Sequence, residues 1–179
     1  MKIFNLAKVI KAPVNLLRIS LLSDTHSHID DKVLKLCNGS DEIWHAGDIG
    51  DLAVTDKLQN VAPVRAVYGN IDGSQIRSTW PLHQRFMAEN VDVWITHIGG
   101  YPGRYAPRVK DAINQDPPKL FITGHSHILK VVNDKKLDLL HMNPGAIGMY
   151  GLHQVRTLLR FSIEGNRIFD LEVAEIPRK

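Results

Sequence analysis

Several apolar segments of this 179-residue chain end in residue types that commonly bind metal ions. The first segment, Ile19–Leu22, leads directly into Ser23-Asp24-Thr25-His26. Alternate residues of an extended chain point to the same side, so Asp24 and His26 can contact one ion together. An Asp-x-His pair taken alone is common by chance. This pair constrains the fold because four later segments end in a similar way.

Five predicted strand ends together supply seven ligand-type residues. These are Asp24, His26, Asp48, Asn70, His97, His125 and His127. In open α/β sheets, ligands bind in the crevice outside the carboxyl ends of the strands. We therefore expect the seven side chains to line one crevice. Chance supplies one or two such endings but seldom five.

The number of candidate ligands indicates two ions. A catalytic zinc-like ion takes about three protein ligands, and a structural one four. Two ions that share a bridging carboxylate would use all seven residues, and Asp48 is the natural bridge because it is the lone carboxylate of its segment. Paired catalytic ions lie ~3.5–4 Å apart. Their excess positive charge suits a phosphate ester and a hydroxide.

The pattern of elements predicts one domain spanning residues 1–179, with residues 1–15 as a short N-terminal leader. Up to Tyr68, strands alternate with helices, which predicts a parallel sheet of βαβ units. Later residues predict a hairpin of strands 83–89 and 91–95, a helix over 107–115, and further short strands. The pattern allows either one mixed sheet or two facing sheets.

Composition excludes several classes of protein. The net charge is only +3 and the basic residues are scattered, which argues against a nucleic-acid partner. No apolar run reaches about 18 residues, so no transmembrane helix or membrane partner is expected. The single cysteine, Cys37, fits a packed thiol in a reducing compartment, and we expect a cytoplasmic protein. A homo-oligomer is left open.

The motifs resemble those of the calcineurin-like metallophosphoesterases, especially the small bacterial and archaeal phosphodiesterase branch that also resembles the retromer subunit Vps29. The resemblance spans about residues 19–145. It rests on Asp24-Thr25-His26, Gly47-Asp48, Gly69-Asn70-Ile71-Asp72, Thr96-His97, Gly124-His125-Ser126-His127 and Asn143-Pro144-Gly145.

The resemblance implies a four-layer α/β/β/α sandwich of two mixed sheets flanked by helices. It also implies a first metal ion held by Asp24, His26, Asp48 and His127, and a second held by Asp48, Asn70, His97 and His125. The expected activity is hydrolysis of a small phosphodiester by a metal-bridging hydroxide. Manganese is the favoured metal, and iron, nickel or zinc also suit these ligands.

The chain departs from the family pattern in two places. Many members carry a histidine after the Asn of the third motif, where it is thought to protonate the leaving oxygen, but this chain has Ile71. A positioned general acid is typically worth about 10²–10⁴-fold, so poor leaving groups should react slowly. The second departure is Ile98-Gly99-Gly100 after His97.

We expect the substrate contacts of the second half to come from a Gly/Pro/Tyr-rich loop. Its residues Tyr101, Arg104 and Tyr105 could touch the substrate, and Arg104 could clamp a phosphate. Arg104 therefore joins Asp48 and Asn70 as a candidate catalytic residue. Among the remaining polar residues, we expect His45 in the core, Asp72 bracing the Asn70 loop, and Asp51 at a helix start.

Three alternatives to a phosphodiesterase stay open. A Vps29-like protein-interaction scaffold would keep the fold while hydrolysis is vestigial or absent. A phosphomonoesterase or a nucleotide pyrophosphatase would use the same ions on a different ester. A mononuclear hydrolase is disfavoured because it would leave Asn70, His97 and His125 without a role.

Overall fold

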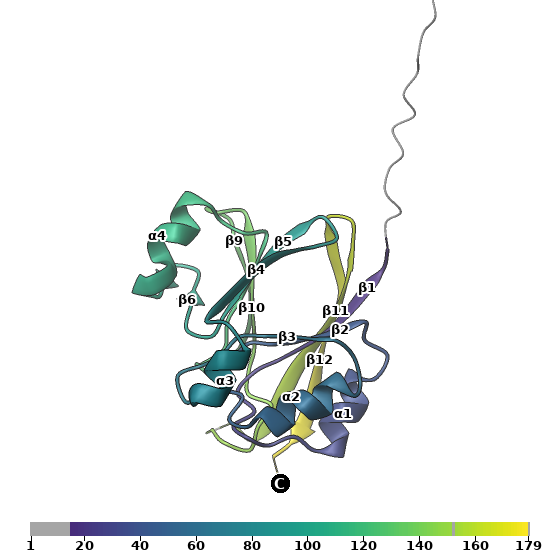
Figure 1. Cartoon of the computed structure of the whole chain (residues 1–179). Helices are drawn as coiled ribbons and strands as arrows, with labels where there is room; N and C mark the ends of the chain where they lie inside the picture. The colour runs from purple at the N-terminus through teal and green to yellow at the C-terminus, as the bar shows by residue number, and fades with distance from the viewer. Residues whose placement is uncertain (1–14, 152, 179) are drawn as a thin grey trace, which may run out of the picture.

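The described residues form two five-stranded sheets. Figure 1 shows that these sheets face each other. The computed structural model describes residues 15–151 and 153–178, so the predicted leader lies, apart from Asn15, outside the described residues. The strand order is β12-β11-β1-β2-β3 in the first sheet and β4-β5-β8-β10-β9 in the second. Both sheets contain parallel and antiparallel pairs, so both are mixed.

The strands of the first sheet are β1 (Leu17–Leu22), β2 (Glu42–His45), β3 (Val64–Ala66), β11 (Val155–Glu164) and β12 (Arg167–Pro177). Those of the second are β4 (His83–Ala88), β5 (Val91–Thr96), β8 (Leu120–Ile122), β9 (Leu129–Asp134) and β10 (Leu139–Pro144). A short hairpin of β6 (Gly100–Tyr101) and β7 (Arg104–Tyr105) stands apart from both.

Within the described residues, four helices flank the sheets: α1 (Asp31–Cys37), α2 (Leu52–Gln59), α3 (Ser74–Thr79) and α4 (Pro107–Gln115). Polar side chains fix where the first two begin. The Asp30 carboxylate accepts a hydrogen bond from Val33 N, and the Asp51 carboxylate accepts one from Ala53 N, which confirms Asp51 at a helix start. Pro107 occupies the first turn of α4, where its missing N–H costs nothing.

Three apolar clusters hold the layers together. The cluster between the two sheets contains Leu21 and Trp44 from one sheet and Val93 and Ile122 from the other. A second cluster joins the outer face of the first sheet to α1, α2 and α3, and a third joins the second sheet to α4. Together with Figure 1, this confirms the predicted α/β/β/α sandwich.

The strand and helix predictions agree with the structure in most of the chain. Strands β1, β2 and β3 are parallel, and β4 and β5 form the predicted hairpin. The helix α3 and the β6–β7 hairpin were not predicted, because both are too short for a periodic pattern. Cys37 is fully buried in α1, and burial raises the pKa of its thiol to about 11, which agrees with a packed thiol.

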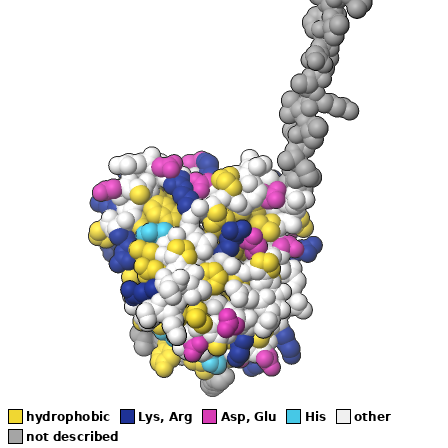
Figure 2. All heavy atoms as spheres, in the orientation of Figure 1, with side chains coloured by type: hydrophobic (Ala, Val, Ile, Leu, Met, Phe, Trp, Pro, Cys, Tyr) yellow, Lys and Arg dark blue, Asp and Glu magenta, His cyan; other side chains and the backbone are white. Residues whose placement is uncertain are grey.

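The described surface carries mixed charge. On the face shown in Figure 2, Lys and Arg side chains are interspersed with Asp and Glu. This distribution agrees with the scattered basic residues of the sequence. Among the described residues, every helix is too short or too polar to cross a lipid bilayer.

One ion pair connects the start of α1 to the distant strand β11. Arg156 is buried, and its Nη2 donates to Asp30 Oδ2 over 2.8 Å. Partial burial acts to raise the pKa of Asp30. The Val33 N–H and Arg156 outweigh that effect and hold the pKa of Asp30 below its ordinary value. Asp30 therefore stabilises the fold in two ways, as a helix cap and as the partner of a buried cation.

We expect Asp30→Ala to lower the free energy of unfolding by about 2 kcal/mol or more, because the cap is lost and a buried cation is left unpaired. Urea unfolding measures this. The neighbouring exposed Asp31→Ala is the matched control and should cost less than about 0.5 kcal/mol. Because the pKa of Asp30 is depressed, the wild-type advantage is complete above the unfolded pKa of about 4 and is lost as the pH falls through the folded pKa. Equal losses in the two variants would contradict this role.

Candidate metal centre

The seven predicted ligand residues all follow the carboxyl ends of strands. Asp24 and His26 follow β1, Asp48 follows β2, and His97 follows β5. Asn70 follows β3, while His125 and His127 follow β8. Backbone hydrogen bonds hold these loops together: Asp24 N donates to Gly47 O, and Gly124 N donates to His97 O. Between the two sheets, His125 N donates to Asp24 Oδ2 over 3.2 Å.

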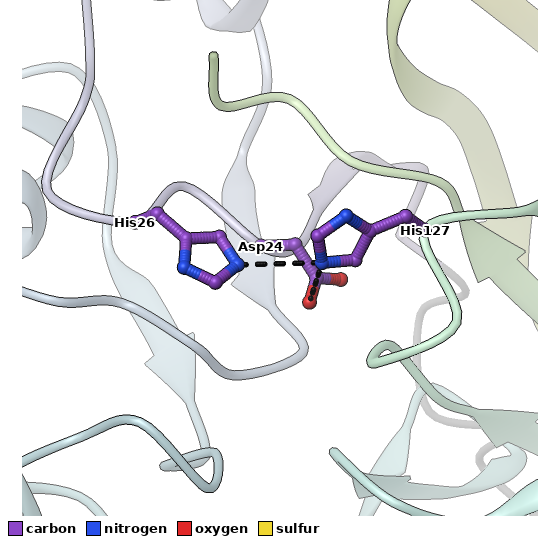
Figure 3. Close-up of side chains that lie close together, drawn as sticks. All are labelled: Asp24, His26 and His127. Atoms are coloured by element: carbon purple, nitrogen blue, oxygen red, sulfur yellow. Dashed lines mark hydrogen bonds and ion pairs between the residues drawn. The ribbon is translucent and has the colours of Figure 1, made fainter. Parts of the chain in front are cut away.

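The first group of side chains is Asp24, His26 and His127, which offer ligand atoms within 4.8 Å of one another. Figure 3 shows the two imidazole rings pointing toward each other beside the Asp24 carboxylate. His26 Nε2 lies 3.3 Å from His127 Nε2, and His127 Nε2 lies 3.2 Å from Asp24 Oδ1. One oxygen and two ring nitrogens thus converge on a point where a single cation could bind.

The second group is Asp48, His97 and His125, and Asp48 also reaches the first group. Asp48 Oδ1 lies 3.2 Å from His97 Nε2, whereas Asp48 Oδ2 lies 3.7 Å from His26 Nε2. The two oxygens of one carboxylate therefore face different groups. In this position Asp48 could contribute one oxygen to each of two ions.

Asn70 and Arg104 lie at the borders of the second group. Asn70 is exposed and lines a cavity of about 240 Å³ together with His97. Arg104 is exposed on β7 and lines a separate cavity of about 320 Å³ together with His125. The structure thus brings six of the seven predicted ligands into two clusters, and Asn70 lies beside the second cluster. Arg104 does not belong to either cluster and lines the cavity that His125 borders.

The carboxylates and histidines shift one another's pKa values. Burial acts to lower the pKa of His97, but Asp48 and Asp24 outweigh it and hold the pKa above its ordinary value. Contact with Asp24 raises the pKa of His127. Burial acts to raise the pKa of Asp48, but His97 and the Ile71 N–H hold it below its ordinary value. The site therefore favours positive charge between its two carboxylates.

Two buried polar atoms point to a cation. Asp24 Oδ1 and His97 Nε2 are inaccessible to solvent and lack a hydrogen bond of acceptable geometry to any described residue. Buried polar atoms are normally paired, since an unpaired one costs about 1–3 kcal/mol. Both atoms belong to the two clusters, and carboxylate and imidazole are ligand types that divalent metals accept. The residues present therefore fit a pair of divalent ions.

The backbone of the site is in an uncommon conformation. Asp24, His26, Asp48, His125 and His127 all have φ between 48° and 68°, in the left-handed region. Residues other than glycine seldom adopt this region and do so at a cost of roughly 1–2 kcal/mol each. Such strain gathers at functional sites, where the surrounding structure enforces it. Here it turns the side chains away from their strands and toward one another.

Buried polar contacts keep the loops in this conformation. The Asp72 carboxylate accepts hydrogen bonds from Ile49 N, Gly50 N and Gly69 N, which ties the Asp48 loop to the Asn70 loop as predicted. His45 is buried and burial lowers its pKa to about 4, so it is neutral. Its Nδ1 accepts from Gly47 N, which leaves Nε2–H to donate to Thr25 Oγ1. His45 thus positions the loops from the core.

Three residues near the clusters were not found by sequence reasoning. The Tyr150 ring lies 5.5 Å from the His26 ring, and Lys130 lines the same cavity as His125. The third residue is Arg178. A Cβ on Gly151 would stand 3.0 Å from both His127 Nδ1 and Arg178 Nη1, so the glycine leaves space for Arg178 beside His127. None of the three comes directly after an apolar segment of the kind that identified the ligands. They reach the site from a loop, an edge strand and the chain end.

The family of this chain follows from comparison with known proteins. Residues 17–166 match the model of the calcineurin-like phosphoesterase superfamily domain. That match covers most of the chain, so the protein belongs to this superfamily. The two side-chain clusters fit the pair of metal ions on which the family depends.

Individual relatives agree with this placement. A protein of Methanothermobacter thermautotrophicus named "Probable metallophosphoesterase" is 28% identical over 135 residues, covering 72% of this chain and 76% of the relative. Wild-type Vps29 of Entamoeba histolytica, solved with Zn²⁺, has a TM-score of 0.71 at 17% identity, over 91% of this chain and 100% of that one. A structure described as a novel archaeal phosphodiesterase has a TM-score of 0.63 at 22% identity, over 90% and 99%. The two structures show a shared fold.

We expect Gly69→Ala to reduce metal binding, because its new Cβ would stand only 2.0 Å from Asp48 Oδ1 and would displace that carboxylate. Gly73→Ala, four residues later, is the matched control, since no heavy atom lies within 4 Å of its Cβ and its φ is −78°. Metal per chain after dialysis against Mn²⁺, read by mass spectrometry, should fall in the first variant alone. Full metal content in Gly69→Ala would show that Asp48 does not have to keep its observed position.

Proposed function

We propose that this member of the phosphoesterase superfamily is a phosphodiesterase that works with two divalent ions, with manganese the favoured metal. The observation that carries the proposal is the position of Asp48, whose two oxygens face different clusters. A single-ion enzyme has no need of such a carboxylate. A cytoplasmic location is part of the same proposal and rests on the single cysteine.

The proposal assigns the first ion to Asp24, His26, Asp48 and His127, and the second to Asp48, Asn70, His97 and His125. When bound, such ions stabilise charge on the phosphoryl oxygens and lower the pKa of a coordinated water to about 7. The protein's part is to hold each ring nitrogen and carboxylate oxygen in place before substrate arrives. The left-handed loops and the Asp72 brace supply that preorganisation.

The chain's other residues determine which esters react. Ile71 follows Asn70, and its aliphatic side chain cannot donate a proton. A leaving group must therefore depart unaided or take its proton from water. Arg104 stands on the β6–β7 hairpin beside the cavity that His125 borders, where its guanidinium can bind a phosphoryl oxygen. Diesters with good leaving groups are the substrates that this arrangement favours.

The Vps29-like scaffold is the alternative from another class. The structural likeness to Vps29, at 17% identity, concerns the fold alone. A phosphomonoesterase and a nucleotide pyrophosphatase are the alternatives among enzymes, and they would use the same clusters. Activity measurements on matched esters separate these possibilities.

We expect the Mn²⁺-loaded protein to hydrolyse bis(p-nitrophenyl) phosphate faster than p-nitrophenyl phosphate, and to lose activity when a chelator removes the metal. Asp48→Asn should lower kcat/KM by about 10²-fold or more, because even residues behind a metal ligand are typically worth 10–100-fold. Release of p-nitrophenolate measures both effects.

Asp51→Asn is the control for that variant. It makes the same chemical change at an exposed carboxylate, and Asn also caps helices well. Full activity is expected. Bound metal without turnover of either ester would contradict an enzyme and favour the scaffold, while faster turnover of the monoester would favour a phosphomonoesterase.

We also expect the rate to fall steeply as the pKa of the leaving group rises, because position 71 offers no acid. Ile71→His should raise kcat on an alkyl ester by about 10²-fold, at the lower end of the usual effect of a general acid, and should change aryl esters little. Ile71→Leu is the control of similar size and should match the wild type. A rate that is the same across leaving groups in the wild-type protein would contradict this view of Ile71.

A further inference from the structure

The cavity of about 320 Å³ next to His125 is built by parts of the chain that the metal clusters do not use. One wall is the β6–β7 hairpin with the start of α4. The opposite wall is β9 with the preceding Ile128, and β10 contributes His141 and Asn143. We call this space the hairpin cavity. Because His125 borders it, a group attached to a phosphorus atom at the second cluster can extend into it.

The lining of the hairpin cavity suits a ring. Ile98, Ile128, Ala106 and Pro107 present apolar surface, and Tyr101 adds an aromatic ring. Ile128 is 50% exposed, so its apolar side chain is available to contact a ring in the cavity. Pockets for small molecules measure about 300–1,000 Å³, and this cavity lies at the lower end of that range.

The charges of the hairpin cavity are all positive. Lys130 and Arg104 line it, and no Asp or Glu is among its lining residues. Lys130 Nζ lies 3.7 Å from the centre of the Tyr101 ring, and among the described residues neither cation has a carboxylate within ion-pair distance.

The polar groups around the hairpin cavity do not compensate these two cations. Burial lowers the pKa of His141 to about 4, so its ring is neutral. Tyr105 donates its hydroxyl proton to Asp134 over 2.6 Å, and Asp134 also accepts from the backbone of its own turn. The Asp134 carboxylate is therefore already hydrogen-bonded to other groups. Two cations without anionic partners beside an apolar pocket call for an anion in the ligand.

We propose that the hairpin cavity binds one ester arm of the substrate, and that this arm carries an aromatic ring and a second anionic group, as a nucleotide does. The ring lies against Ile128 and Tyr101, and Lys130 binds the second anion, while Arg104 is left for the reacting phosphoryl group. This inference rests on the proposed phosphodiesterase function, since it names the class of diester that the same site takes.

A larger cavity of the described residues lacks these features. It measures about 580 Å³ and is lined by Lys119 and Asp138, which pair with each other. None of the seven candidate ligands borders it. Its charges are balanced, and it does not adjoin a site where chemistry could take place.

A pair of chromogenic diesters tests the proposal. One is the p-nitrophenyl ester of thymidine 5′-phosphate, and the other is the same ester with an additional 3′-phosphate. We expect the Mn²⁺-loaded wild-type protein to show a KM about three- to tenfold lower for the second, because its extra phosphate gains charge-assisted hydrogen bonds. Equal KM values would overturn the proposal.

Substitutions locate that preference. Lys130→Met should bring the two KM values together, and Lys130→Glu should reverse their order. Lys135→Met is the matched control, since Lys135 is exposed on the turn between β9 and β10 and does not line the hairpin cavity. It should keep the wild-type preference. A preference that survives in Lys130→Glu would overturn the assignment of Lys130.

A binding measurement separates this proposal from the proposed function. If neither ester is hydrolysed by the metal-loaded protein, the phosphodiesterase function fails, and titration calorimetry with thymidine 3′,5′-bisphosphate tests the cavity alone. Binding that Lys130→Glu weakens at least tenfold and Lys135→Met leaves intact supports the cavity as a nucleotide site. Absence of binding, or equal affinity in both variants, overturns it.

Discussion

The two buried carboxylates of Asp24 and Asp48 constrain everything around them. Asp24 is fully buried and Asp48 is 2% exposed. Removing a carboxylate from water costs several kcal/mol unless positive charge and hydrogen bonds compensate it. Neighbouring imidazoles supply part of that compensation, and the same contacts raise the pKa values of His97 and His127. Divalent cations would supply a larger positive charge.

The fold makes this arrangement possible because it brings together the strand ends of both sheets. Strands β1 and β2 are parallel in one sheet, and β5 and β8 are parallel in the other, so their carboxyl ends can meet. Close contacts then require glycine. A Cβ on Gly47 would lie 2.6 Å from His97 Nδ1, and one on Gly124 would lie 2.1 Å from Ser23 Oγ. The glycines that precede Asp48 and His125 therefore allow the two sheets to approach.

Much of this could be predicted from the sequence because the signal is local. Each strand of the site is an apolar run, and each ligand-type residue directly follows one, so Asp48 and His127 are visible without coordinates. Asp72 could be predicted as a brace because it lies two residues after Asn70. The fold itself came from a resemblance of motifs, and the two facing sheets were only one of the two options that the strand pattern allowed.

The remaining features depend on distances that no local pattern encodes. Lys130 lies on an edge strand whose neighbour is β10, and it borders the same cavity as His125 and the β6–β7 hairpin. That hairpin has two residues in each strand, too few to show alternation. Tyr150 reaches His26 from a loop after β10, more than a hundred residues along the chain. Such contacts come from tertiary packing, and the substrate preferences that we propose depend on them.

The most direct test of the two-cation site is anomalous X-ray diffraction from crystals grown with Mn²⁺. The account predicts two anomalous peaks per chain, ~3.5–4 Å apart. One should be bounded by Asp24, His26 and His127, the other by His97 and His125, with the Asp48 carboxylate between them. A single peak, or peaks at surface carboxylates while these residues keep their positions, would contradict it.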